Sequence, residues 1–145
     1  TTALDVTVQA QIFELLKELR GKTNTAIILI THDMGVVYEM AQRMIVMYAG
    51  RKVEEGSVNQ VIKSPAHPYT QGLISCVPHL TDKQPEIRER LLEIPGIVPS
   101  LNSFGLNKCL FESRCHKPLE RCFSSKPQEK LISSGHHAYC WNLGK

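Results

Sequence analysis

Several features are missing from this chain of 145 residues. No apolar run approaches the ~20 residues that a membrane-spanning helix needs. The amino terminus also lacks the basic, apolar and small-residue order of a signal peptide. The 17 basic and 14 acidic residues are scattered, with no block of one sign and no basic stripe interleaved with aromatics. These absences exclude a nucleic-acid footprint and a membrane span, and they predict a protein in the cytosol or facing it.

Cysteine is unevenly distributed. Four of the five cysteines lie in the last third of the chain, at Cys109, Cys115, Cys122 and Cys140. A cytosolic chain keeps its thiols reduced, so metal ligation is favoured over disulfides. Successive cysteines are separated by five, six and seventeen residues, which is looser than the two to four residues usual between paired zinc ligands. Zinc, a larger iron-sulfur cluster and inert thiols stay open, with His116, His136 and His137 as alternative ligands.

The first 30 residues predict a helix followed by a strand. We expect Thr7 to cap a helix that ends at Gly21. Its apolar residues follow the spacing of one buried face: Val8, Ile12, Leu15, Leu16 and Leu19. The unbroken apolar run from 26 to 30 predicts a strand covered on both faces, as in a parallel sheet. Together these two elements predict an α/β layer.

Polar residues follow this strand immediately. Open α/β sheets place their ligands at the carboxyl ends of strands, where Thr31, His32 and Asp33 lie. His32 is therefore a candidate for chemistry, although a histidine that caps the next helix or binds backbone is the alternative. Asp33 is better explained as the cap of a short helix over 34–41.

The rest of the chain divides into a regular part and an irregular part. We expect strands over 43–48 and 51–55, joined by a tight turn at Ala49 and Gly50. Ser57 caps a short helix through Ile62, and a further helix covers 69–77, in which Cys76 is a buried small hydrophobe. Prolines and charges from 78 to 100 predict a segment without regular structure. We place the domain boundary between 64 and 78.

Several short segments together resemble the second half of an ABC-type nucleotide-binding domain. Residues 2–5 (Thr-Ala-Leu-Asp) resemble its D-loop, and 26–33 resemble the strand and switch-histidine loop. Residues 46–50 and the run His-Pro-Tyr-Thr at 67–70 are similar to the oligopeptide and dipeptide branch of that family. The segments at 94–96 and 98–100, with the four cysteines, resemble the extra carboxy-terminal domain of this branch.

This resemblance implies a fold and two domains. The fold class is α/β: a partial ABC-type nucleotide-binding domain, the second half of a P-loop ATPase core, followed by a small, loop-rich cysteine-cluster domain. Residues 1–70 would form the first domain and 71–145 the second. The resemblance makes His32 the catalytic residue that contacts the γ-phosphate and orients water. Asp5 would cross a dimer interface toward the partner's nucleotide.

The same resemblance shows which parts are missing. No Gly-rich loop ends in Lys and Ser or Thr, no Ser-Gly-Gly signature occurs, and no apolar strand ends in Asp-Glu. Phosphoryl transfer depends on the phosphate loop, its Lys and Mg²⁺. We therefore expect the carboxy-terminal part of an ATPase that is inactive by itself, although the full-length subunit uses ATP and Mg²⁺.

The resemblance also implies cofactors and partners. The family is associated with a 4Fe-4S cluster in its cysteine domain, which we expect at Cys109, Cys115, Cys122 and Cys140, with zinc as the alternative. Expected partners are transmembrane permease subunits and a second ATP-binding subunit, at the cytoplasmic face of the membrane. The solute is a dipeptide, an oligopeptide or nickel, and the chain alone is expected to self-associate. The alternative function is a self-contained metal-stabilised interaction module.

Overall fold

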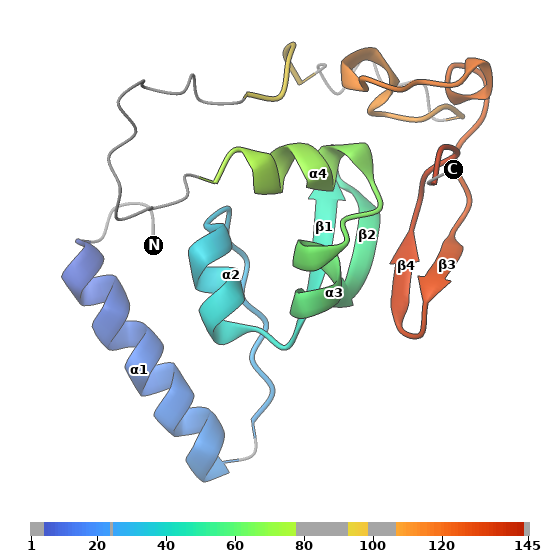
Figure 1. Cartoon of the computed structure of the whole chain (residues 1–145). Helices are drawn as coiled ribbons and strands as arrows, with labels where there is room; N and C mark the ends of the chain where they lie inside the picture. Colours follow the sequence, from blue (N-terminus) through green and yellow to red (C-terminus); the bar gives the residue numbers. More distant parts are fainter. Residues whose placement is uncertain (1–4, 24, 78–92, 99–106, 144–145) are drawn as a thin grey trace. The chain divides into compact units, whose positions relative to one another are not determined.

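The computed structural model describes residues 5–23, 25–77, 93–98 and 107–143 (Figure 1). The chain forms two compact units, residues 1–41 and 42–145, which are described separately here. The boundary that the sequence predicted at 64–78 therefore falls inside the second unit. The assignment of 1–70 and 71–145 to two family domains stays a prediction, and most of the irregular segment predicted at 78–100 lies outside the described residues.

The first unit holds two helices, α1 (Val6–Thr23) and α2 (Met34–Met40). The Asp5 carboxylate accepts a hydrogen bond from the Thr7 amide at 3.0 Å. Asp5, and not Thr7, therefore satisfies one of the amides left open at the start of α1, which corrects the predicted cap. The helix also passes Gly21 and ends only at Thr23, whose hydroxyl donates to the Leu19 carbonyl at 2.7 Å.

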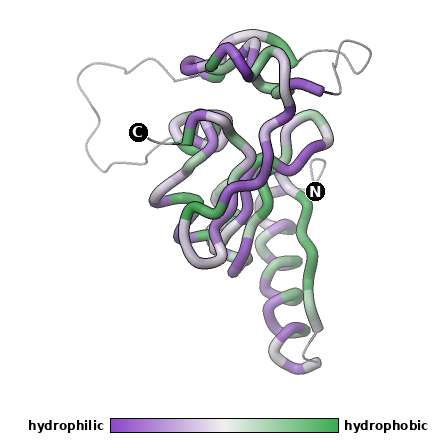
Figure 2. Tube along the Cα trace, turned by 90° about the vertical axis from the view of Figure 1, so that its right-hand side faces the viewer, coloured by the Kyte–Doolittle hydropathy of each residue, from purple (hydrophilic) through white to green (hydrophobic). Residues whose placement is uncertain are grey.

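The predicted strand over 26–30 is not formed. This segment is green in Figure 2 because it is apolar, yet it carries no strand, and Ile28 and Ile30 are 91% and 93% exposed. A strand requires hydrogen bonds to a neighbouring strand, and none of the described residues supplies one. For the same reason the apolar face of α1 is incompletely covered, with Leu15 65% exposed. Both predictions assumed a parallel sheet that the described residues do not contain.

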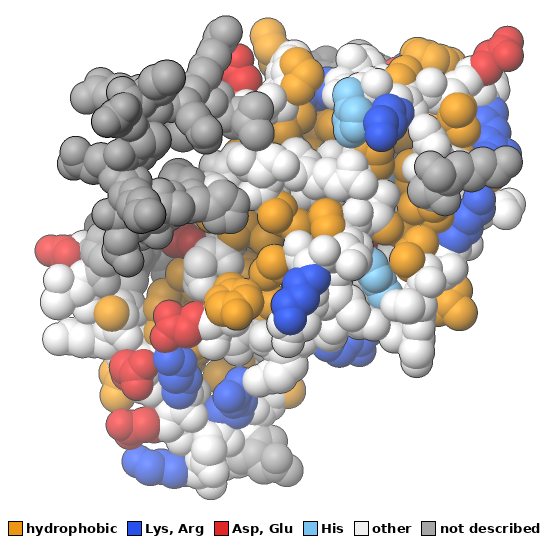
Figure 3. All heavy atoms as spheres, in the orientation of Figure 1, with side chains coloured by type: hydrophobic (Ala, Val, Ile, Leu, Met, Phe, Trp, Pro, Cys, Tyr) orange, Lys and Arg blue, Asp and Glu red, His pale blue; other side chains and the backbone are white. Residues whose placement is uncertain are grey.

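Polar contacts connect the two helices of the first unit. The Lys17 ammonium lies 2.9 Å from Glu14 on α1 and 2.6 Å from Glu39 on α2. Arg20 donates to the Met40 carbonyl at 3.5 Å. Acidic and basic side chains are mixed over the α1 region in Figure 3. Water and salt screen such exposed ion pairs, so they orient the helices more than they stabilise them.

The second unit is built on a four-stranded antiparallel sheet. Its strands are β1 (Arg43–Tyr48), β2 (Arg51–Ser57), β3 (Lys130–Ser133) and β4 (His136–Ala138), in the order β1-β2-β4-β3. The β1–β2 hairpin confirms the two predicted strands, with β2 two residues longer than expected. The β3–β4 hairpin from the end of the chain pairs with the free edge of β2, which the sequence did not predict. The α/β class is confirmed at this coarse level, with an antiparallel sheet.

A two-residue turn and a bulge shape the first hairpin. Ala49 and Gly50 have φ angles of 49° and 75°, as both central residues of a type I′ turn require. Between the pairs Val46–Glu54 and Met47–Lys52 the register shifts, so that Val53 is an extra residue on β2. Both Val53 and Glu54 are buried. The bulge thus brings a carboxylate into the core beside an apolar side chain.

Two helices follow the hairpin, α3 (Val58–Lys63) and α4 (Pro68–Ser75). Ser57 caps α3 through a capping box with Gln60, as the sequence predicted for Ser57. On α4, a Cβ at Gly72 would meet the Ile94 side chain at 2.8 Å, so the helix approaches the 93–98 segment closely. Cys76 is half-buried at the end of α4, which makes it less enclosed than predicted. No helix within the described residues is long and apolar enough to cross a membrane.

Candidate functional site

His32 lies in a short polar loop between the apolar segment and α2. The Thr31 hydroxyl accepts from the Asp33 amide at 3.0 Å. The Asp33 carboxylate accepts from the amides of Gly35 and Val36 at 2.8 and 3.3 Å, which confirms it as the cap of α2. The His32 side chain is exposed and makes no hydrogen bond to any residue that the structure describes. The loop therefore fixes the backbone on both sides of His32 and leaves its imidazole accessible.

Asp5 lies at the other end of the first unit's sequence and has a structural partner. Its carboxylate is engaged by the Thr7 amide, and its carbonyl accepts from Gln9 at 2.9 Å. No contact between Asp5 and His32 is found among the described residues. Their assignment to a nucleotide site and a dimer interface stays a prediction.

The clustered cysteines of the second unit lie near two 3₁₀ turns and β4: Cys109 and Cys115 flank the first turn, Cys122 ends the second, and Cys140 follows β4. The turns are η2 (Glu112–Arg114) and η3 (Glu120–Cys122). Each thiol accepts a backbone hydrogen bond, from Phe111 for Cys109, Lys117 for Cys115, Leu119 for Cys122 and Asn142 for Cys140. The Cys109 amide also donates to the Cys122 carbonyl at 2.9 Å. Amide donors to sulfur stabilise thiolate charge and tune metal–sulfur centres.

The thiols influence one another electrostatically. The pKa of Cys109 is raised to about 11, mainly by burial and to a smaller extent by the neighbouring Cys122, Cys140 and Cys115. Burial likewise raises the pKa of Cys115 and of Cys140, again with contributions from other thiols of the set. Without a cation these three thiols therefore stay protonated near neutral pH. Even so, within the described residues no three His, Cys, Asp or Glu side chains are arranged so that they could hold a metal ion.

The histidines proposed as alternative ligands have other surroundings. His136 is buried, and its Nε2 lies 2.7 Å from the Glu54 carboxylate. The Nδ1 of His137 lies 3.9 Å from Glu129, and His116 is exposed. His136 is thus committed to Glu54 in this structure.

A buried carboxylate that the sequence did not single out organises the second unit. Glu54 is 0% exposed and accepts from the amides of Ala66 and His67 at 2.8 and 2.9 Å, in addition to its contact with His136. It thus links β2 to the residue before α4 and to β4. In a regular strand, neighbouring side chains alternate between the buried and the exposed face, so a buried Glu next to a buried Val would not be predicted. The bulge explains this pair.

His67 in the His-Pro-Tyr-Thr run is a capping residue. It is 1% exposed, and its Nδ1 accepts from the Tyr69 amide at 3.1 Å at the start of α4. Burial lowers the pKa of His67 to about 4, against the opposing effect of Glu54. The ring also lies 5.7 Å from that of Phe111. The motif that carried part of the family resemblance is therefore a structural one in this fold.

Arg114 explains the Ile-Pro-Gly segment. Its guanidinium donates to the carbonyls of Pro95 and Ile94 at 2.8 and 3.0 Å and lies over the Tyr48 ring. Gly96 has a φ of 79°, and a Cβ there would press on Arg114 at 3.4 Å. Arg114 directly precedes Cys115, so this clamp attaches the cysteine-bearing loop to β1. No sequence signal marked Arg114 among the other basic residues.

Comparison with known proteins now gives the class of the chain. Residues 53–122 match the family described as "Oligopeptide/dipeptide transporter, C-terminal region". The chain is 48% identical, over 97% of its length, to a probable peptide ABC transporter ATP-binding protein of Sinorhizobium fredii. It is 44% identical, over the same share, to the dipeptide transport ATP-binding protein of Escherichia coli and to an oligopeptide transport ATP-binding protein of Bacillus subtilis.

The chain therefore matches the carboxy-terminal part of ATP-binding proteins of oligopeptide/dipeptide ABC transporters. It spans only about two fifths of the length of these relatives, at 41 to 42%. The family match begins within β2 and ends at Cys122, so it includes Glu54, His67 and three of the four clustered cysteines.

Proposed function

We propose that this chain is part of the ATP-hydrolysing subunit that energises import of di- or oligopeptides across the cell membrane. The observation that carries the proposal is the 48% identity over 97% of the chain to a peptide ABC transporter ATP-binding protein. ATP and Mg²⁺ would bind in the full-length subunit, at the cytoplasmic face of the membrane. Transmembrane permease subunits and a second ATP-binding subunit would be its partners.

In this proposal His32 acts on the γ-phosphate. A neutral imidazole can donate one hydrogen bond to a phosphate oxygen and accept another from the attacking water, and so orient that water without a fixed charge. The exposure of His32 and the restraint of its loop by Thr31 and Asp33 support this role. Asp5 would contact the second subunit's nucleotide from the start of α1. Because the sequence lacks a phosphate loop, we expect this chain alone to be inactive toward ATP.

We further propose that Cys109, Cys115, Cys122 and Cys140 hold a 4Fe-4S cluster, with zinc as the alternative. The donor set fits such a group: four soft thiols, electrostatically close and each supplied with a backbone amide donor. The thiols would have to move together on binding, since the described arrangement is not yet a metal site. Once bound, the metal would cross-link the loops of η2 and η3 to the end of β4.

Uptake of a labelled dipeptide into vesicles tests the transport proposal. The full-length subunit, its partner subunit and its permease are reconstituted with Mg-ATP on the side of the ATP-binding subunits. ATP-dependent accumulation is expected for the native complex and absent with His32→Ala. Uptake that continues without ATP, or that is unchanged in the variant, would refute the proposed function; accumulation of nickel but not of peptide would change the solute.

A further inference from the structure

The second unit contains a cavity that the transport function does not use. It has a volume of about 300 Å³ and lies between the β1–β2 hairpin, the loop of Cys109 and the segment of Lys126. None of the described residues that line the cavity is acidic. Four of them are basic, namely Arg51, Lys52, Lys108 and Lys126. Aromatic walls come from Tyr48, Phe111 and Tyr139.

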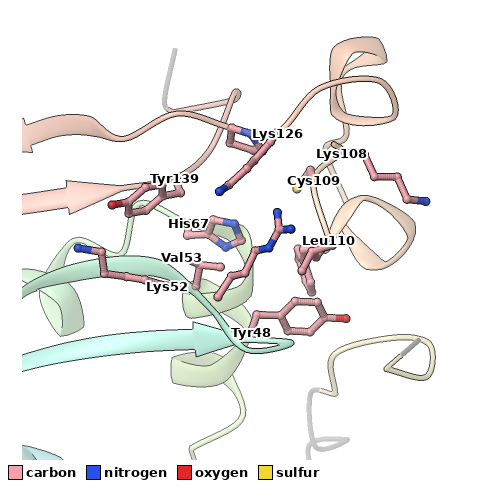
Figure 4. A pocket seen from close by; sticks show the side chains of 12 residues that line it. Tyr48, Lys52, Val53, His67, Lys108, Cys109, Leu110, Lys126 and Tyr139 are labelled. Atoms are coloured by element: carbon pink, nitrogen blue, oxygen red, sulfur yellow. The ribbon is translucent and has the colours of Figure 1, made fainter. Parts of the chain in front are cut away.

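The four cations are not equivalent. Lys52 is engaged by Glu55 at 2.6 Å, and Lys108 by Glu112 at 2.7 Å. Lys126 makes no ion pair with any described residue, and its ammonium faces the same space as the His67 ring and the Cys109 thiol (Figure 4). Arg51 adds a guanidinium to the lining of the cavity. The cavity is therefore positive at the Lys126 side.

His67 supplies a buried donor to the same space. Because Nδ1 accepts from the Tyr69 amide at 3.1 Å, the proton of the neutral ring is on Nε2. The side chain is 1% exposed, and no described residue accepts from this N–H. His67 lines the cavity, so this N–H can donate to an acceptor atom that enters it.

We propose that this cavity binds a small organic anion, whose carboxylate or phosphate lies among Lys126, Arg51 and the Nε2–H of His67. The apolar body of the ligand packs on the aromatic walls. The volume of the cavity is at the lower end of the range of small-molecule pockets. An inorganic ion alone would not fill it. His32 belongs to the other unit and does not line this cavity.

Titration of the whole chain with three matched probes tests this site. Phenyl phosphate and phenylacetate share an aromatic ring with phenylacetamide, which has no charge. Binding is followed by calorimetry and by the NMR signals of the His67 ring. At least one anion is expected to bind with a dissociation constant of about 1 mM or lower, and at least tenfold more tightly than the amide. The anion that binds more tightly shows whether the site prefers a phosphate or a carboxylate head group.

Two variants and one control locate the binding. Lys126→Ala should weaken the preferred anion at least tenfold, whereas Lys117→Ala, an exposed lysine that does not line the cavity, should not change its affinity. His67→Asn keeps a capping oxygen for α4 but loses the Nε2 donor, and it should also weaken the anion. The proposal is overturned if neither anion saturates the protein, if phenylacetamide binds equally well, or if Lys126→Ala binds like the native chain.

Discussion

Among single residues, Glu54 has the largest structural role that can be tested. Glu54→Ala would remove the acceptor for two backbone amides and for His136, all in the interior. Buried donors that lose a charged acceptor cost several kcal/mol, so we expect a loss of about 3 kcal/mol in the free energy of unfolding. Urea unfolding measures this loss.

The exposed Glu120 provides the matched control. Glu120→Ala should change the free energy of unfolding by no more than about 0.5 kcal/mol, as is usual for surface positions. A Glu54→Ala variant as stable as Glu120→Ala would show that the buried hydrogen bonds do not hold the second unit together.

His67 predicts a pH dependence of stability. Its pKa is about 4 in the folded chain and 6.5 in its ordinary state. Between these values the unfolded chain binds more protons than the folded chain, so stability falls as the pH drops from about 6.5 to about 4. Once the pH is below both values, the total loss in unfolding free energy is on the order of 3 kcal/mol, because each pKa unit corresponds to about 1.36 kcal/mol.

Replacing the titrating group isolates this effect. His67→Asn keeps a cap but cannot titrate, so its unfolding free energy should depend less steeply on pH between 4 and 6.5 than that of the native chain. The measurement is a series of urea curves at several pH values. Identical slopes for both proteins would assign the acid sensitivity to other groups.

At the level of elements, the β1–β2 turn is expected to respond oppositely to two substitutions. Ala49 pays the cost of a positive φ that Asn tolerates better, so Ala49→Asn should raise the unfolding free energy by about 0.5 kcal/mol. Gly50→Ala introduces a Cβ at a φ of 75° and should lower the unfolding free energy by about 1 kcal/mol. The cost comes from the backbone conformation alone, because no atom lies within 4 Å of that Cβ. Thermal unfolding compares both variants, and shifts of the same sign would contradict the type I′ assignment.

The elements also show how far sequence reasoning reaches. The β1–β2 hairpin, the Asp33 cap and the Ser57 cap were predicted correctly because their signals are local: turn residues, and side chains that reach amides two or three residues away. The strand at 26–30 was predicted from its apolar run, but pairing depends on a partner that the run does not specify. Glu54, Arg114 and the addition of β4 to β2 depend on contacts between residues far apart in sequence, which no local pattern encodes.

The candidate site divides in the same way. His32, Asp5 and the four cysteines were identified by spacing and family resemblance, and the structure gives their surroundings without testing their roles. His67 was noticed only as part of a motif, and its burial and cap became apparent with the fold. The cavity at Lys126 brings together residues as far apart in sequence as Tyr48 and Tyr139, so no local pattern could have predicted it.

At the level of the whole molecule, the metal content of the chain tests the cysteine assignment. Anaerobically purified protein should contain about four irons per chain and absorb broadly near ~400 nm, as a 4Fe-4S cluster requires. Cys122→Ser should lose the metal, whereas Cys76→Ser, which changes the fifth cysteine, should keep it. One zinc per chain without iron would show that the four cysteines bind zinc and not an iron-sulfur cluster. Full metal content in Cys122→Ser would show that these cysteines are not the ligands.

Exposed apolar residues of the first unit bear on assembly. Ile28 and Ile30 are almost fully exposed in the structure, and contiguous apolar surface promotes association. Self-association of the chain in isolation therefore stays a prediction. Within a longer ATP-binding subunit, the same residues would be expected to pack against the remainder of the nucleotide-binding domain.

The central claim is that this chain supplies the switch histidine of an ATPase, and the hydrolysis step itself tests it most directly. In the full-length subunit, single-turnover hydrolysis of Mg-ATP and the nucleotide dissociation constant are measured for the native protein and for His32→Ala. Because the proposed role of the histidine is mainly to stabilise the transition state, the account predicts that the hydrolysis rate falls on the order of 100-fold or more while affinity stays within about threefold. An unchanged rate, or an equal loss of affinity and rate, would contradict it.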